Sequence, residues 1–176
     1  YSTLTMARGG HPPDPFALRR AARAPRRQVI QIVDFLQRTR FPTYSLCHTG
    51  ARIGIREGRR VVCDYNLTEQ DIVDGAERRP CPDAIAVATC HIDLLDPKAQ
   101  GGGGRREPIR PYPIPLRSLL VKSVRNLLVA GKCIGGDQVA MASYRMIPTC
   151  CAMGQAAGTV TALALAAGKA DPREVP

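Results

Sequence analysis

The stretch Asn126-Leu127-Leu128-Val129-Ala130-Gly131 decides the expected fold, together with the long run of small residues that follows it. A continuous apolar run ending in glycine is typical of a strand buried on both faces in a parallel sheet. Pro148 suits a first helical position, residues 149–167 are rich in small residues, and Gly168 suits the position after a helix. The order strand, glycine-rich turn, helix predicts an α/β ligand-binding fold.

Upstream of this stretch, the hydrophobic pattern predicts a long helix and a hairpin. Apolar residues at helical spacing indicate a helix over residues 26–39. A short helix over residues 16–23 is expected to be terminated by Pro25, within an otherwise irregular segment over residues 1–25. Alternation of polar and apolar residues over 52–65 predicts a hairpin.

Three further signals place elements in the middle of the chain. Thr68, three residues before Asp71, predicts the start of a helix. Residues 83–89 form a small, apolar run that predicts a strand. The four glycines at residues 101–104 predict a loop, because glycine has the greatest backbone freedom.

The charge balance bears on the class of partner. The sequence has 25 Lys and Arg against 15 Asp and Glu, a formal net charge of +10. An excess of this kind favours anionic partners such as nucleic acid. Much of it lies in the first forty residues, where few aromatic side chains are available to stack on bases. We therefore expect a solvated helix face, and nucleic acid is not the expected partner.

The sequence also bears on location. Residues 146–167, the longest stretch of low charge, are interrupted by Pro148 and by glycines, so a membrane span is not expected. The chain opens at Tyr1 without a charged start leading into an apolar run, so no signal peptide is expected and the cytoplasm is the expected compartment.

Cysteine usage argues against disulfides and metal. The seven cysteines include no C-x-x-C pair, so reduced and mostly buried thiols are expected. Cys90-His91-x-Asp93 resembles a metal-ligand cluster but lacks a distant partner, so no metal site is expected. Cys150 and Cys151 are adjacent and point in different directions on a helix, so we expect them to be packing residues.

Small residues recur three or four positions apart along the final helix and leave one face nearly bare, so that a backbone or a flat ligand can approach closely. They are Gly154, Ala157, Gly158 and Thr161. The start of this helix offers unpaired amides and the positive end of the helix dipole, which favour a phosphate or a partly anionic ring oxygen. Close packing against a sheet explains the same small residues equally well, so both interpretations stay open.

Several ordered blocks resemble a broad family of FAD-dependent oxidoreductases. In the C-terminal part they are residues 112–119 (YPIPLRSL), 126–134 (NLLVAGKCI), 143–150 (SYRMIPTC) and 153–158 (MGQAAG). Upstream, residues 53–60 (IGIREGRR), 67–71 (LTEQD) and 83–86 (DAIA) are similar to the middle region of the same family, in the same order. The resemblance covers residues 26–167, and several blocks in one order are more specific than a single glycine motif.

This resemblance implies the C-terminal part of a doubly wound FAD-binding domain over residues 111–176, and part of an α+β substrate or cap region over residues 26–110. The corner after the predicted strand would lie near the ribityl chain and pyrophosphate of FAD, and the helix start near the pyrimidine edge of the flavin. The implied cofactor-binding residues are Ala130, Gly131, Lys132, Cys133, Pro148, Thr149, Gly154, Gln155, Ala157 and Gly158. Lys132 departs from the family, which commonly has arginine or an acidic residue there.

Two arginines are candidates for a catalytic or substrate-binding role. Arg145 precedes the final helix, and Arg56 lies in the predicted hairpin. Each can hold an anionic substrate group or place a positive charge toward the flavin, and an ordinary surface arginine is the alternative for both.

One half of a FAD site is absent from the sequence. The adenine half requires a strand, a G-x-G-x-x-G turn and an acidic residue further on, and the 176 residues contain no such block. The resemblance therefore implies an oxidoreductase whose N-terminal FAD-binding half lies in a longer parent or a partner chain, with this chain inactive alone and its small-molecule substrate unidentified. A basic polyanion-binding module and a non-catalytic remnant are the alternatives.

Overall fold

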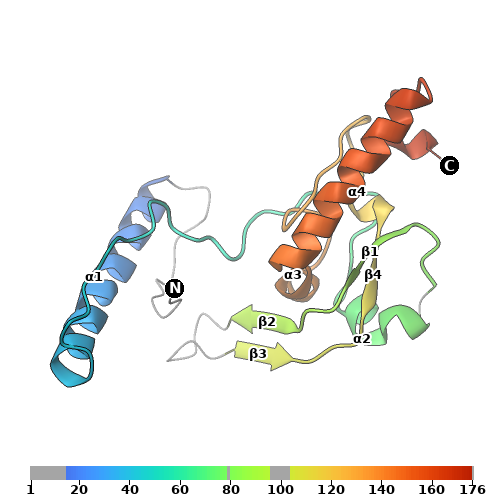
Figure 1. Cartoon of the computed structure of the whole chain (residues 1–176). Helices are drawn as coiled ribbons and strands as arrows, with labels where there is room; N and C mark the ends of the chain where they lie inside the picture. The colour runs from blue at the N-terminus through green and yellow to red at the C-terminus, as the bar shows by residue number, and fades with distance from the viewer. Residues whose placement is uncertain (1–14, 79, 96–103, 176) are drawn as a thin grey trace. The chain divides into compact units, whose positions relative to one another are not determined.

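A computed structural model describes residues 15–78, 80–95 and 104–175 of the protein (Figure 1). The chain forms two compact units. Unit 1 consists of residues 1–56 and 97–102, and unit 2 of residues 57–96 and 103–176. The predicted loop over residues 101–104 lies outside the described residues except for Gly104.

Unit 1 contains the helix α1 (Pro15–Thr39). The predicted helix over residues 26–39 is confirmed, but the expected termination at Pro25 is wrong, because α1 runs through this residue. Proline removes one amide donor and its ring crowds the preceding turn, but the alanines, arginines and glutamines around it are good helix formers that favour continuation of the helix. The chain after α1 returns along it, since Arg26 donates to the carbonyl of Gly50 and Gln37 to that of Tyr44.

Unit 2 is built on two antiparallel strand pairs. The strand β1 (Ala84–Ala88) pairs with β4 (Tyr112–Pro115), and β2 (Ile92–Leu95) pairs with β3 (Gly104–Glu107). β1 confirms the strand predicted over residues 83–89. The short 3-10 helix η2 (Leu116–Ser118) follows β4, and η3 (Pro172–Glu174) lies close to the C-terminal end of the chain.

Three helices complete unit 2 and enclose its core. They are α2 (Glu69–Arg78), α3 (Gln138–Tyr144) and α4 (Ile147–Ala166). α2 packs on β4, α3 on β2, and α4 on β1. The largest core side chains are fully buried: Tyr112, Ile114, Leu119, Ile134, Met141, Tyr144 and Met153. The mixed content of helix and strand agrees with the predicted α/β class.

The hairpin predicted over residues 52–65 is wrong. This segment bonds to distant parts of the chain: the Val61 amide donates to Cys133 O, the Lys122 amide donates to Val62 O, and Cys63 forms an isolated antiparallel bridge with Val121. Alternating residues suit an extended chain, but they do not select its partner, and here residues 120–122 and 133 provide the better one.

The strand predicted over residues 126–130 is also wrong. Asn126 has a positive φ of 52°, Leu127 is 44% exposed, and the only strand-like contact of the segment is a single antiparallel bridge from Leu128 to Leu120. A strand of a parallel sheet needs at least one neighbouring parallel strand with which to pair. Among residues 15–78, 80–95 and 104–175 no such neighbouring strand is present.

The predicted start of α2 is confirmed. The Asp71 amide donates to the hydroxyl of Thr68, and the Thr68 amide donates to the Asp71 carboxylate, which is the reciprocal arrangement of a capping box. The α2 start has a third partner, because the Glu69 amide donates to Oδ2 of Asp137 at 2.7 Å. Asp137 is also the N-cap of α3, with its Oδ1 accepting from the Ala140 amide at 2.8 Å.

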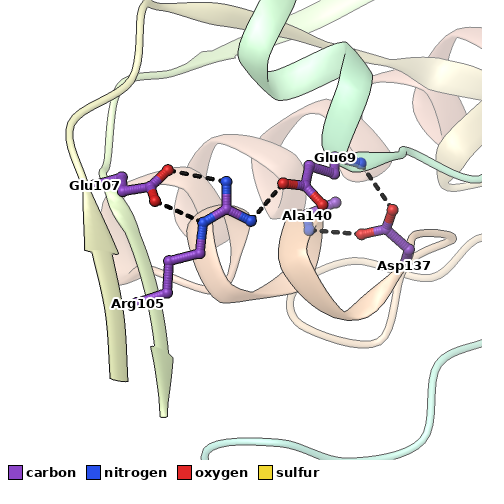
Figure 2. Close-up of polar contacts among 5 residues, drawn as sticks. All are labelled: Glu69, Arg105, Glu107, Asp137 and Ala140. Atoms are coloured by element: carbon purple, nitrogen blue, oxygen red, sulfur yellow. Dashed lines mark hydrogen bonds and ion pairs between the residues drawn. The ribbon is translucent and has the colours of Figure 1, made fainter. Parts of the chain in front are cut away.

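A charged network joins the starts of α2 and α3 to β3 (Figure 2). Arg105 on β3 forms ion pairs with Glu107 and with Glu69, the first residue of α2. Asp137 therefore caps two helix starts, and Arg105 ties one of them to the β2–β3 pair.

The predicted final helix is confirmed as α4, with Pro148 in its first turn. Its end is closed by Gly168, which has a φ of +68°. The Gly168 amide donates to Leu165 O, and the Lys169 amide donates to Ala164 O at 2.8 Å. This pair of bonds is a Schellman motif, which satisfies the last carbonyls of the helix.

Candidate functional site

The corner of residues 130–133 lies beside the first turn of α4. Gly131 has a φ of +94°, and a Cβ placed on it would lie 4.0 Å from Sγ of Cys150. A turn holds the corner, because the Ile134 amide donates to Gly131 O and the Cys133 thiol donates to Ala130 O. The structure therefore brings together two segments, separated by about fifteen residues, that the sequence assigned to one cofactor site.

The start of α4 has no side-chain cap. Its N-cap residue, Met146, makes no such bond, and the first bonded amide is that of Cys150, which donates to Met146 O. Pro148 has no amide hydrogen, and in the described part of the chain the amides of Ile147 and Thr149 have no backbone or side-chain acceptor. These donors and the positive end of a twenty-residue helix favour an anionic group at this position.

Two glycines make the outer face of α4 bare. Apart from the neighbouring backbone of α4 itself, no heavy atom lies within 4 Å of a Cβ built on Gly154 or on Gly158, and both residues are exposed, as is Gln155. Thr149 and Ala157 lie on the inner side, where Thr149 is 4% exposed and Ala157 packs against the core. The predicted cofactor-binding residues that belong to α4 therefore divide between its two faces.

The outer face of α4 is also apolar. The helix contains no charged residue, yet Ile147 is 79% exposed and Leu165 is 71% exposed. By length and composition alone α4 is long and apolar enough to cross a bilayer, a test that the core helix of a water-soluble protein also passes. Because a helix that is apolar all round is normally buried, this face is suited to be covered.

The thiol beside the corner is poorly suited to act as a nucleophile. Burial is the main cause that raises the pKa of Cys150, and its neighbour Cys151 raises it further, while Lys132 acts in the opposite direction. A raised pKa keeps the thiol protonated at neutral pH. All seven cysteines are free, but only Cys63 is buried, four are half-buried, and Cys47 and Cys151 are exposed, so the expectation of mostly buried thiols is wrong.

The two candidate arginines lie in different surroundings. The side chain of Arg145 is 5% exposed, with Nη1 3.6 Å from Oε1 of Glu57 and with Nη2 donating to Asp93 O. It thus joins the end of α3 to β2, and the surface alternative does not hold for it. Arg56 is exposed and belongs to unit 1, whereas Arg145 belongs to unit 2.

Sequence reasoning missed Asp137. The signal was present, since an aspartate stands immediately before the apolar run that forms α3, a common N-cap pattern. Its second bond, to the amide of Glu69, joins residues 68 positions apart and had no local signal.

In the comparison with protein families, a match spans almost the whole chain. The model of the family described as FAD dependent oxidoreductase matches residues 3–176. Searches of the curated proteins and of the solved structures return no match. Because this match covers nearly all of the residues, the chain belongs to the FAD dependent oxidoreductase family.

Proposed function

We propose that this chain supplies the ribityl, pyrophosphate and flavin-ring side of the FAD site in a FAD-dependent oxidoreductase. The observation that carries the proposal is that the corner of residues 130–133 lies beside the uncapped start of α4. Membership of the family supports the cofactor. FAD, when bound, supplies hydride or electron transfer, while the protein supplies position and electrostatics.

The described residues fit such a cofactor. The amides of Ile147 and Thr149 can donate to a phosphate or to a flavin carbonyl oxygen, and the helix dipole favours the negative charge. Gly131 has no side chain to separate its backbone from a ligand. Lys132, on the same corner, is exposed and adds a positive charge that complements a pyrophosphate.

A second part of the site is needed. We propose that a segment carrying the G-x-G-x-x-G turn, in a longer parent or a partner chain, completes a doubly wound domain and covers the outer face of α4. Two features support this: the bare surface at Gly154 and Gly158, and the exposed apolar side chains of Ile147 and Leu165. The chain alone then lacks the means to hold FAD tightly.

Native mass spectrometry of the protein purified from its source tests the proposal. A chain heavier than the 19.0 kDa of these residues, with the added mass of one FAD, is the expected result. A chain of 19.0 kDa without flavin would contradict it and would favour the polyanion-binding or non-catalytic alternatives.

Variants on the outer face of α4 make the test specific. In the flavin-containing protein, Gly154→Leu and Gly158→Leu are expected to lower the flavin retained after dialysis, because each adds a side chain where a flat ligand or a backbone would approach. Leu163→Ala is the control, since it shortens a half-exposed side chain on the same helix. Flavin retention that stays at the wild-type level in both leucine variants would refute the assignment of this face.

A further inference from the structure

The positive charge of the chain is concentrated in unit 1. Its residues include 11 Lys and Arg and two Asp, a net charge of +9, whereas unit 2 has 14 Lys and Arg against 13 Asp and Glu, a net charge of +1. Nearly all of the formal charge of +10 therefore belongs to the smaller unit. An excess of this kind favours an anionic partner for unit 1 and not for unit 2.

Six of the arginines of unit 1 lie on α1, and three of them form one line along it. The helix has a single acidic residue, Asp34, which pairs with Arg38. Arg19, Arg23 and Arg27 are four positions apart, so their side chains lie one above the other on the same face. All three are exposed, and among the described residues no carboxylate pairs with them. Their charges are therefore available to a partner.

Two exposed apolar side chains extend this line at both ends. Phe16, three residues before Arg19, is 71% exposed, and Ile30, three residues after Arg27, is 62% exposed. Phe16, Arg19, Arg23, Arg27 and Ile30 together are the basic stripe of α1. At 1.5 Å per residue the stripe is about 20 Å long. It presents three positive charges between two apolar ends.

The stability of α1 does not explain the basic stripe. Arginines four positions apart on a helix repel one another, and this repulsion destabilises the helix. Phe16 and Ile30 expose apolar surface to water, which is also unfavourable. A partner that places negative charge on the arginines and an apolar layer against both ends would offset these two costs.

An anionic lipid bilayer provides both. Its anionic headgroups attract Arg and Lys side chains, and the boundary below them accepts the apolar side chains of a helix that lies in the plane of the interface. A nucleic acid provides the charge, but its bases are bound by aromatic side chains that stack on them. No aromatic residue lies between Arg19 and Arg27. The basic stripe therefore fits a bilayer better than a nucleic acid.

We propose that the basic stripe of α1 binds the protein to the surface of an anionic bilayer. The guanidinium groups of Arg19, Arg23 and Arg27 contact the lipid headgroups, and Phe16 and Ile30 insert at the boundary between headgroups and acyl chains. This attachment is peripheral, because the helix lies on the membrane and does not cross it. It goes beyond the proposed FAD site, which involves residues of unit 2 only.

Sedimentation of the 176-residue chain with lipid vesicles tests the charge of the stripe. Vesicles of phosphatidylcholine with phosphatidylserine should bind the chain, and vesicles of phosphatidylcholine alone should bind it about tenfold more weakly or less. The triple variant Arg19→Gln, Arg23→Gln and Arg27→Gln should lose about tenfold or more of the binding to the mixed vesicles. Equal binding of the wild type to both kinds of vesicle would overturn the proposal.

A matched triple variant in unit 2 controls for net charge. Arg59→Gln, Lys122→Gln and Arg125→Gln remove the same three charges from exposed positions outside unit 1. This variant should bind the mixed vesicles as the wild type does. Equal losses in the two triple variants would show that total charge and not the basic stripe attracts the bilayer, and would refute the site.

The apolar ends distinguish a bilayer from a nucleic acid. Phe16→Ala with Ile30→Ala should weaken binding to the mixed vesicles by about tenfold. Val62→Ala with Val87→Ala, which shorten side chains 63% and 61% exposed in unit 2, should not. Unchanged vesicle binding without the two apolar ends would contradict insertion. Tighter binding to a duplex DNA oligonucleotide than to the mixed vesicles, equal in wild type and this variant, would replace the bilayer by nucleic acid.

The variants of the stripe should not disturb the fold. Glutamine is as good a helix former as arginine, and alanine is better than phenylalanine or isoleucine, so circular dichroism should show α1 intact in both. Flavin takes no part in these measurements. Their outcome is therefore independent of the proposal for FAD.

Discussion

α3 and α4 follow one another in the chain, but they differ in N-terminal capping and in burial. α3 begins at a carboxylate that caps it, and all of its residues from Ala140 to Tyr144 are buried. α4 is nearly three times as long, has no side-chain cap and buries only one face, through Thr149, Met153, Val160 and Ala164. The protein's own side chains cap and bury α3, whereas α4 has an uncapped start and an exposed outer face.

The difference is confined to two parts of α4. Its C-terminal end is closed by the Schellman motif at Gly168, so the helix itself is fully formed. Only the amides at its start and its apolar outer face are left for another group. An uncapped start and an exposed apolar face are the two features on which the proposed half of a cofactor site rests.

The largest effect is expected from the inner face of α4. Met153 is fully buried in the core, so Met153→Ala should lower the free energy of unfolding by about 2–5 kcal/mol. Leu165 is 71% exposed, and Leu165→Ala should change the same quantity by no more than about 0.5 kcal/mol. Urea denaturation of both variants measures the contrast, and equal losses would show that the two faces of α4 are buried alike.

The cap of α3 gives the next effect. Asp137→Ala removes the acceptor of two helix-start amides, Glu69 and Ala140, and should cost about 2 kcal/mol, at about 1 kcal/mol for each cap. Asp137→Asn keeps one acceptor oxygen and should cost about half as much. The free energy of unfolding of the wild type and of both variants tests this prediction. If Asp137→Ala loses no stability beyond the experimental error, the cap of α3 does not distinguish it from α4.

The bare face of α4 should respond with the opposite sign. Gly158→Ala adds a methyl group where no heavy atom other than the neighbouring backbone of α4 lies within 4 Å, and alanine is the better helix former by about 1 kcal/mol. The isolated chain should therefore gain stability. Gly135→Ala is the contrasting control, because its Cβ would lie 2.5 Å from Tyr65 O and should destabilise the chain. Thermal unfolding separates the two signs, and a destabilised Gly158→Ala would mean that this face is already covered.

The smallest effect concerns pH at the network beside the α3 cap. The hydrogen bonds from Arg105 hold the pKa of Glu107 below its usual range. Because the pKa is lower in the folded chain, this contribution to stability is present above the unfolded pKa of about 4.3 and is lost as pH falls through the folded value. Glu107→Gln should therefore flatten the acid side of the stability curve slightly. The urea midpoint of both proteins, measured as a function of pH across this range, tests the coupling. The same pH dependence in both proteins would contradict it.

Local signals in the sequence were sufficient for several elements. Thr68 and Asp71 predicted the α2 start, residues 83–89 predicted β1, and Pro148 with Gly168 marked the two ends of α4. Each depends on bonds or backbone preferences within a few residues, which neighbouring side chains determine. The ordered blocks of sequence also predicted the family, and the family match confirms this prediction.

The tertiary structure decided everything that needed a distant partner. Residues 126–130 are apolar enough for a buried strand, but they make a single bridge to Leu120, and residues 57–65 bond to residues 120–122 and 133 and not to one another. Tertiary contacts likewise bury Arg145, add the second bond of Asp137 and place Gly131 beside Cys150. Hydrophobic periodicity and capping residues determine which secondary structure a segment can form. Strand pairing and burial depend on which distant segments pack against it, and only the folded chain brings those segments together.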